Sequence, residues 1–189
     1  MKNNNNALPA SIAKVAAITL LILIIPFTAS LITDEMAWSL YDFLLAGVML
    51  FGTGSAYVMI SRLSGSVLYK AAVGLGLSSA LFLVSANLAV GIIGSVDNII
   101  NLFYFLVVLL LVFGSFIVRF QPRGMAFTLF TTALAQTVMI PVALISGMQS
   151  APGSSVMEII LLNGLFISLF MLSGILFWQD DKNLKSHQS

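Results

Sequence analysis

The stretch 99–124, IINLFYFLVVLLLVFGSFIVRFQPRG, decides the fold. Residues 99–118 are apolar along most of their length and carry no charge, whereas 119–124 contain two arginines together with Pro122 and Gly124. About 20 predominantly apolar residues in an α-helix cross the ~30 Å hydrocarbon core of a bilayer. Pro and Gly disfavour helix continuation. The stretch therefore predicts a transmembrane helix followed by a short basic turn.

Five other long apolar stretches flank this one. The chain has a mean hydropathy of +1.06, with 59% hydrophobic and 8% charged residues, whereas about a quarter of the residues of an ordinary soluble domain are charged. These spans leave no room for a soluble catalytic domain. The prediction is an all-α integral membrane bundle of six transmembrane helices in one domain, 10–178, between a disordered lead-in, 1–9, and a polar tail, 179–189. The expected spans are 10–32, 36–61, 69–94, 99–118, 125–147 and 156–178.

The basic residues all fall on one side of this topology. The other side carries only acidic residues, Asp34, Glu35, Asp97 and Glu158. Loops rich in Lys and Arg stay in the cytoplasm, so we expect both termini and the tail to be cytoplasmic. The eight basic residues are Lys2, Lys14, Arg62, Lys70, Arg119, Arg123, Lys182 and Lys185.

The first span has an alternative interpretation as a secretory signal that is cleaved near Thr28-Ala29-Ser30, which would leave five spans. The apolar run 15–32 is long for a signal peptide. The sidedness of the basic residues also fits six spans. We therefore expect an uncleaved first helix.

Small residues four positions apart mark where helices are expected to touch, because this spacing lets backbones approach closely in lipid. The pattern predicts that spans two, three and six are interior and that span four, rich in Leu, Val and Phe, faces lipid. The predicted helix-packing residues are Gly52, Ala56, Gly74, Gly76, Ser78, Ala80, Gly164 and Ser168.

Three polar residues, Asp42, Asn87 and Asn163, lie about six or seven residues from the outer ends of their spans, or ~10 Å deep at ~1.5 Å per residue. Gln136 lies deeper. An ionisable group within a span is a candidate functional site because hydrocarbon penalises it. The pattern suggests a polar outer vestibule of Asp42, Asn87, Gln136 and Asn163. A structural role is the favoured alternative, since intramembrane amides often join helices by hydrogen bonds.

The composition indicates no cofactor, metal or catalytic residue. The chain has no cysteine and one histidine, His187, whereas metal sites usually need several convergent ligands. No paired-histidine motif, nucleophile–base arrangement or Gly-rich phosphate loop occurs. We expect a protein that is not an enzyme and does not bind nucleic acid. Its expected partners are the lipid bilayer and either another membrane protein or further copies of itself.

The stretches 87–95 (NLAVGIIGS), 97–104 (DNIINLFY) and 119–126 (RFQPRGMA) resemble a recurrent pattern in an uncharacterised family of small bacterial polytopic inner-membrane proteins. Ala133-Leu134-Ala135-Gln136 and Trp38 with Asp42-Phe43 fit it too, so the resemblance covers roughly 36–147. The chain departs from the pattern at Val96 and Ile99-Ile100. The resemblance implies a multi-pass protein of the bacterial inner membrane and no particular activity.

Three functions remain open. The favoured one is a non-enzymatic membrane module that assembles with or stabilises a partner through its Gly-rich helix faces. The alternative is a small permease or transport-associated subunit that uses the polar vestibule. An intramembrane enzyme has the least support. A water-filled cavity reaching Asp42 would favour the permease. Tight packing around Asp42 and an exposed small-residue groove would favour the module.

Overall fold

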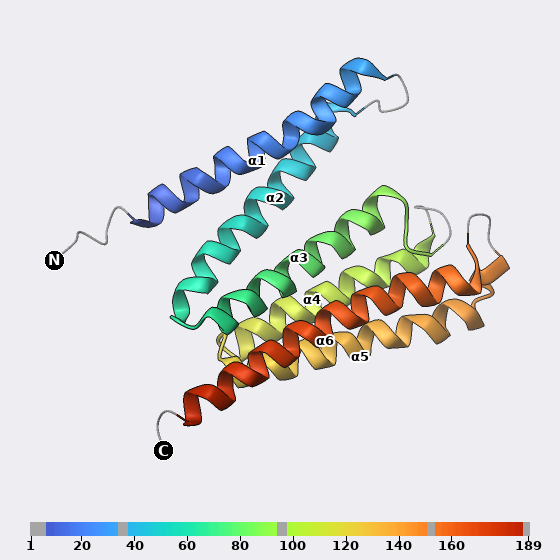
Figure 1. Cartoon of the computed structure of the whole chain (residues 1–189). Coiled ribbons are helices and arrows are strands. Elements are labelled where there is room, and N and C mark those ends of the chain that lie inside the picture. The colour runs from blue at the N-terminus through green and yellow to red at the C-terminus, as the bar shows by residue number, and fades with distance from the viewer. Residues whose placement is uncertain (1–6, 34–37, 94–97, 151–153, 187–189) are drawn as a thin grey trace. The chain divides into compact units, whose positions relative to one another are not determined.

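The computed structural model describes residues 7–33, 38–93, 98–150 and 154–186. The described part is helical and contains no strand (Figure 1). Six of its helices are long and apolar enough to cross a membrane, which confirms the predicted fold class at that level. The direction in which they cross stays a prediction. Most of the predicted lead-in and the acidic loop residues Asp34, Glu35 and Asp97 lie outside the described residues.

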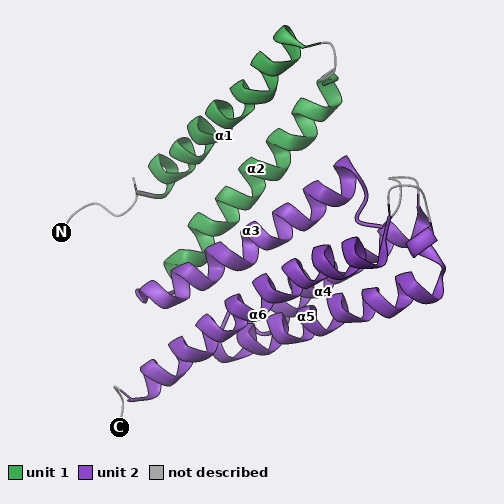
Figure 2. Ribbon diagram, turned by 45° about the vertical axis from the view of Figure 1, so that its right-hand side comes forward, with its two compact units in different colours: residues 1–62 green, residues 63–189 purple. Residues whose placement is uncertain are grey.

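The chain divides into two units, residues 1–62 and 63–189 (Figure 2). Unit 1 contains α1 (Ala7–Ile32) and α2 (Leu40–Ile60), which pack side by side as a hairpin. Unit 2 contains α3 (Val67–Ala89), α4 (Leu102–Ile117), α5 (Pro122–Ile145) and α6 (Val156–Ser186). Short 3-10 turns, η2 (Ser61–Leu63), η3 (Ile99–Asn101) and η4 (Met148–Ser150), adjoin the helices.

In unit 1, the two helices meet where a side chain is missing. A Cβ on Gly54 of α2 would lie 2.6 Å from Cγ1 of Val15 in α1. The Arg62 guanidinium donates to the Ser11 hydroxyl over 3.0 Å near the open end of the hairpin. Among the described side chains of unit 1, only Thr19 is buried, and α2 has no buried residue. Almost all described side chains of the hairpin are therefore at least partly exposed.

In unit 2, α6 packs against both α5 and α3, and α4 packs against α5. The Ser173 hydroxyl of α6 donates to the Ala72 carbonyl of α3 over 2.8 Å. A Cβ on Gly174 would lie 2.6 Å from the Phe130 ring of α5. The helices thus approach closely where small residues stand, and this close packing forms the core of the unit.

Three helices differ from the sequence-based expectation. α2 was expected to be interior, but it has no buried residue. α4 was expected to face lipid, but its residues at helical spacing, Tyr104, Val107, Leu111 and Ser115, are buried and form its packing face. α6 does not end at 178 but continues to Ser186, because Asp180 is buried against the unit and Lys185 pairs with Asp181 at 2.6 Å. Residues 179–186 therefore belong to the helix α6, and most of them are exposed.

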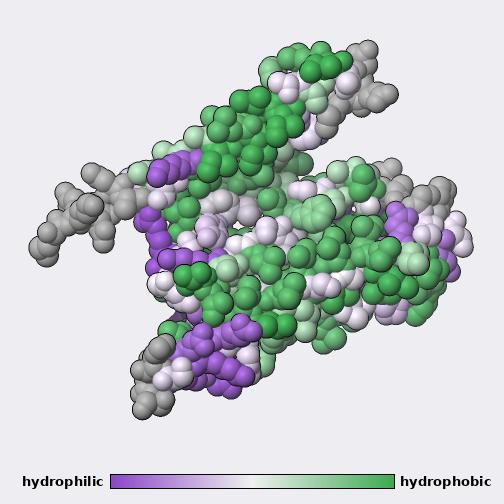
Figure 3. Space-filling view, viewed as in Figure 1, coloured by the Kyte–Doolittle hydropathy of each residue, from purple (hydrophilic) through white to green (hydrophobic). Residues whose placement is uncertain are grey.

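On the face that Figure 3 shows, the surface is mostly hydrophobic along the helices, and hydrophilic residues gather near helix ends. Leu20, Ile25, Phe113 and Leu161 are each more than half exposed. Such a surface would be unstable in water, but hydrocarbon imposes no penalty on it. The described helices therefore form a multi-pass membrane protein by length, composition and surface.

Candidate functional site: the buried amide cluster

Three polar side chains meet inside unit 2, one from each of α4, α5 and α6. The Tyr104 hydroxyl and the Gln136 amide nitrogen both donate to Oδ1 of Asn163, each over 3.0 Å. Nδ2 of Asn163 donates to the Ile159 carbonyl one turn earlier over 2.8 Å. All three side chains are at most 1% exposed. We call Tyr104, Gln136 and Asn163 the amide cluster.

The amide cluster fixes the relative positions of three helices. One carbonyl oxygen has two lone pairs, so Asn163 can accept from both neighbours at once. The bond back to Ile159 holds the Asn163 side chain against its own helix. Gln136 keeps one buried oxygen, Oε1, without a hydrogen-bond partner in the described structure. A buried unsatisfied acceptor is uncommon and carries a free-energy cost.

Asn87 belongs to a second polar contact near the end of α3. Its Nδ2 donates to the Asn101 carbonyl over 2.9 Å. The Asn101 side chain accepts from the backbone N–H groups of Ile92 and Ile93 at 3.2 and 3.1 Å and donates to the Ile93 carbonyl at 3.3 Å. Asn87 and Asn101 therefore hold together the connection between α3 and α4. Oδ1 of Asn87 is a second buried oxygen without a partner among the described atoms.

Asp42 has a different role. It is the third residue of α2, and its Oδ2 accepts from the backbone N–H and hydroxyl of Ser39, both at 2.7 Å. The Asp42 N–H in turn donates to the Ser39 hydroxyl at 3.4 Å, which completes a capping box. The helix starts at Leu40, four residues later than the predicted span, so Asp42 lies in the first turn and is exposed.

The four residues predicted to line a vestibule are therefore in three local environments. Gln136 and Asn163 are bonded to each other, Asn87 bonds to Asn101, and Asp42 caps α2 in the other unit. Tyr104 and Asn101 were not among the predicted site residues. The two residues are three positions apart, so both lie on one face of the helical segment that begins α4. This spacing was the feature of the sequence that could have predicted them.

The predicted helix-packing residues also occupy different environments. A Cβ on Gly76 would lie 3.0 Å from the Ser173 hydroxyl, so Gly76 lies at the α3–α6 contact. Gly52 and Gly164 have no atom within 4 Å of that position. Ser78 and Ser168 are exposed, and each hydroxyl bonds to a carbonyl of its own helix. Gly74, Ala56 and Ala80 are half-buried.

Chemically, the amide cluster can donate and accept hydrogen bonds, and its one ionisable group, the Tyr104 hydroxyl, donates to Asn163. No group of three or more His, Cys, Asp or Glu that would hold a metal occurs among the described residues. Comparison of the chain with protein-family models, curated proteins and solved structures gave no match. The sequence resemblance described above stays a prediction.

Proposed function

We propose that this chain is a non-enzymatic module of the bacterial inner membrane, with both termini in the cytoplasm, that assembles with a membrane-protein partner or with further copies of itself. The proposal is supported first by how the polar groups are used. The amide cluster bonds α4, α5 and α6 to one another, and Asp42 caps a helix. These are structural uses of intramembrane polarity.

The observation that carries the proposal is an open small-residue face on α6. No atom lies within 4 Å of a Cβ built on Gly164, and Ser168, one turn later, is exposed. Glycine in a helix costs about 1 kcal/mol relative to alanine, and a glycine that faces lipid gains no contact in return. A partner helix that approaches this face closely would give Gly164 a favourable contact.

The test replaces this face by large side chains. Gly164→Leu with Ser168→Leu should convert a complex in mild detergent extracts of native membranes to the monomer on native gels. Because a Cβ added to Gly164 would meet no atom outside its own helix, the purified variant should keep the helix content and unfolding midpoint of the parent. Thr137→Leu, an exposed position on α5, is the control and should keep the complex. A parent protein that is already monomeric in these extracts would contradict the proposal.

A small permease or transport-associated subunit is the second candidate. It is favoured by two of the three buried amide oxygens that have no partner among the described atoms, Oε1 of Gln136 and Oδ1 of Asn87, because water or a substrate in a polar path would satisfy them. The chain has no cysteine, so a single introduced thiol reports local access to water. Under the permease hypothesis, the cysteine of Gln136→Cys reacts with a charged thiol reagent in membranes as readily as the cysteine of Ser150→Cys. Under the module hypothesis, it stays as unreactive as lipid-facing Leu134→Cys.

A further inference from the structure

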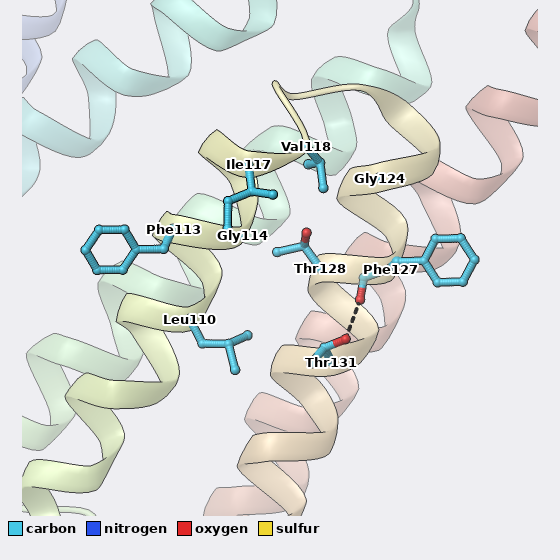
Figure 4. Close-up of a pocket in the computed structure, with 9 residues that line it drawn as sticks. All are labelled: Leu110, Phe113, Gly114, Ile117, Val118, Gly124, Phe127, Thr128 and Thr131. Carbon is cyan, nitrogen blue, oxygen red and sulfur yellow. Dashed lines mark hydrogen bonds between the residues drawn. The ribbon is translucent and has the colours of Figure 1, made fainter.

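A groove lies between α4 and α5 on the outer surface of unit 2 (Figure 4). Its volume is about 370 Å³, and Leu110 and Ile117 of α4 and Thr131 of α5 are among its lining residues. Phe113 and Phe127 lie on its two sides and are 62% and 51% exposed. The groove therefore opens outward, towards the lipid that surrounds membrane-spanning helices, and not into the protein core.

The floor of the groove is a close contact between the two helices. A Cβ on Gly114 would lie 2.6 Å from Cγ2 of Thr128. Near the turn, a Cβ on Gly124 would lie 2.5 Å from Cβ of Val118. Because the helix backbones are this close, no side chain of α4 or α5 can rise from these positions to fill the groove. The depression is thus a consequence of the packing of two glycines.

The size of the groove decides what fits it. From Gly124 to Thr131 it extends ~10 Å at ~1.5 Å per residue, which is most of the ~15 Å that one leaflet contributes to the hydrocarbon core. The volume of the groove is about 370 Å³, and only one face of a helix ~10 Å in diameter could enter it. An extended hydrocarbon chain is narrower and matches the apolar lining.

Positive charge stands at one end of the groove. Val118 and Gly124 line that end, and Arg119 and Arg123 follow and precede them directly in the chain. Both arginines are exposed, and neither forms an ion pair with a described residue. The sequence from 98 to 150 contains no Asp or Glu. An anionic group bound here would meet two guanidinium groups, which bind phosphate through paired hydrogen bonds.

The turn that holds the arginines is tightly constrained. Arg119 and Phe120 have left-handed φ values of 51° and 57°, which are uncommon for residues other than glycine. The Phe120 carbonyl accepts a hydrogen bond from the Tyr69 hydroxyl of α3 over 2.8 Å, and Pro122 begins α5 with its fixed φ. Unusual backbone conformations persist where the surrounding contacts enforce them, often at binding sites. The backbone that carries the two arginines is therefore held in one conformation by its neighbours.

An aromatic pair places this end of the groove at the membrane–water interface. Phe127, which lines the groove, packs edge-on against Trp178 of α6, with ring centroids 5.6 Å apart. Tryptophan is enriched at the level of the lipid headgroups. An acyl chain in the groove would therefore have its phosphate at the level of the arginines.

We propose that the α4–α5 groove binds one anionic glycerophospholipid of the adjoining leaflet, with an acyl chain between Phe113 and Phe127 and the phosphate at Arg119 and Arg123. Lipid with a zwitterionic headgroup enters the same groove less favourably because it lacks the net charge. This binding site is independent of the partner-binding face proposed on α6.

Trp178 provides the readout, since Trp38→Phe leaves it as the single tryptophan. The full chain is placed in bilayers that contain either brominated phosphatidylglycerol or brominated phosphatidylcholine, and bromine quenches nearby tryptophan. We expect phosphatidylglycerol to occupy the groove up to roughly 25-fold more favourably. This ratio corresponds to about 1 kcal/mol for each arginine, at about 1.4 kcal/mol per tenfold.

Arg119→Asn with Arg123→Gln should abolish this preference, and asparagine is chosen because it tolerates the left-handed conformation. Lys182→Ala removes an exposed charge from the same end of unit 2 and should leave most of the preference intact. Thr131→Phe should fill the groove and reduce quenching by both lipids. Its control, Thr137→Phe, replaces another exposed threonine of α5 whose hydroxyl also bonds four residues back, and should not reduce quenching.

Three results would overturn the proposal. The first is equal quenching by the two lipids in the parent protein. The second is a preference for phosphatidylglycerol that survives the double arginine substitution, since nonspecific attraction would then explain it. The third is no quenching by either lipid, as expected if a protein segment covers the groove. Helix content is measured for each variant, and Arg123→Gln alone, which leaves the left-handed turn unaltered, should give an intermediate preference.

Discussion

Replacing Asn163 by leucine tests whether the amide cluster stabilises unit 2. Leucine is similar in size to asparagine but accepts no hydrogen bond, so Asn163→Leu leaves the Tyr104 hydroxyl and the Gln136 amide without their shared acceptor. Both donors are buried, at 1% and 0% exposure. Neither can therefore turn to water without a rearrangement of the helices.

The expected cost follows from these two donors. A buried donor that loses its partner costs about 1–3 kcal/mol, which gives roughly 2–6 kcal/mol for two. Interhelical hydrogen bonds within membranes are weaker, about 0.6 kcal/mol on average, which gives roughly 1.2 kcal/mol for two. Since both groups of this cluster are completely enclosed, we expect Asn163→Leu to lower the free energy of unfolding by about 2–4 kcal/mol.

Tyr104→Phe provides a graded comparison. It removes one donor but leaves Asn163 bonded to Gln136, so the expected loss is only about 0.5–1 kcal/mol. In the Tyr104→Phe background, Asn163→Leu leaves only one donor, the Gln136 amide, without an acceptor. The combined cost should therefore be smaller than the sum of the single costs, by roughly 1 kcal/mol, as expected for residues of one network.

The measurement is equilibrium unfolding in mixed detergent micelles, followed by Trp178 fluorescence in the Trp38→Phe background so that the signal reports on unit 2. Ser168→Leu is the matched control, because Ser168 lies on the same helix and its side chain also bonds to the carbonyl four residues earlier. It is exposed and should change stability by less than about 0.5 kcal/mol. If Asn163→Leu and Ser168→Leu unfold alike, the amide cluster does not stabilise the unit and the reasoning fails.

A reporter fused after Arg123 should lie in the cytoplasm, and a reporter fused at Gln149 should lie outside it. The opposite result would reject the proposed orientation. Gly76→Leu should lower the free energy of unfolding of unit 2 by about 1–3 kcal/mol, because the added side chain must displace α6. Gly164→Leu should leave the free energy of unfolding of the purified monomer unchanged. Equal decreases for the two variants would contradict the contact assigned to Gly76. Ser39→Ala should destabilise the first turn of α2 by about 1 kcal/mol, measured as faster amide hydrogen exchange there, and unchanged exchange would argue against the capping box.

The helices were predictable from sequence because a membrane span needs a long apolar run, and such a run can be recognised without any knowledge of packing. Their ends were less predictable. The start of α2 depends on the Ser39–Asp42 capping box, and the extension of α6 depends on burial of Asp180. Hydropathy registers neither contact, so it placed Asp42 too deep and ended α6 too early.

The candidate site was predictable only in part, for a physical reason. Gln136 and Asn163 attract attention because amides are rare in apolar spans, and the structure joins them. Tyr104 resembles other aromatic residues of α4 until its hydroxyl is found against Asn163. Depth along a helix can be counted from sequence, but the direction of a side chain around the helix depends on which neighbours it packs against. Depth alone therefore grouped Asp42 with residues of another unit.

The division at residue 62 leaves an even number of candidate spans on each side, two in unit 1 and four in unit 2. A polypeptide with an even number of spans begins and ends on the same side of the membrane. Each unit could therefore be inserted, or encoded by a separate gene, without reversing the orientation of the other. Removal of the first hairpin would therefore leave the direction in which α3–α6 insert unchanged.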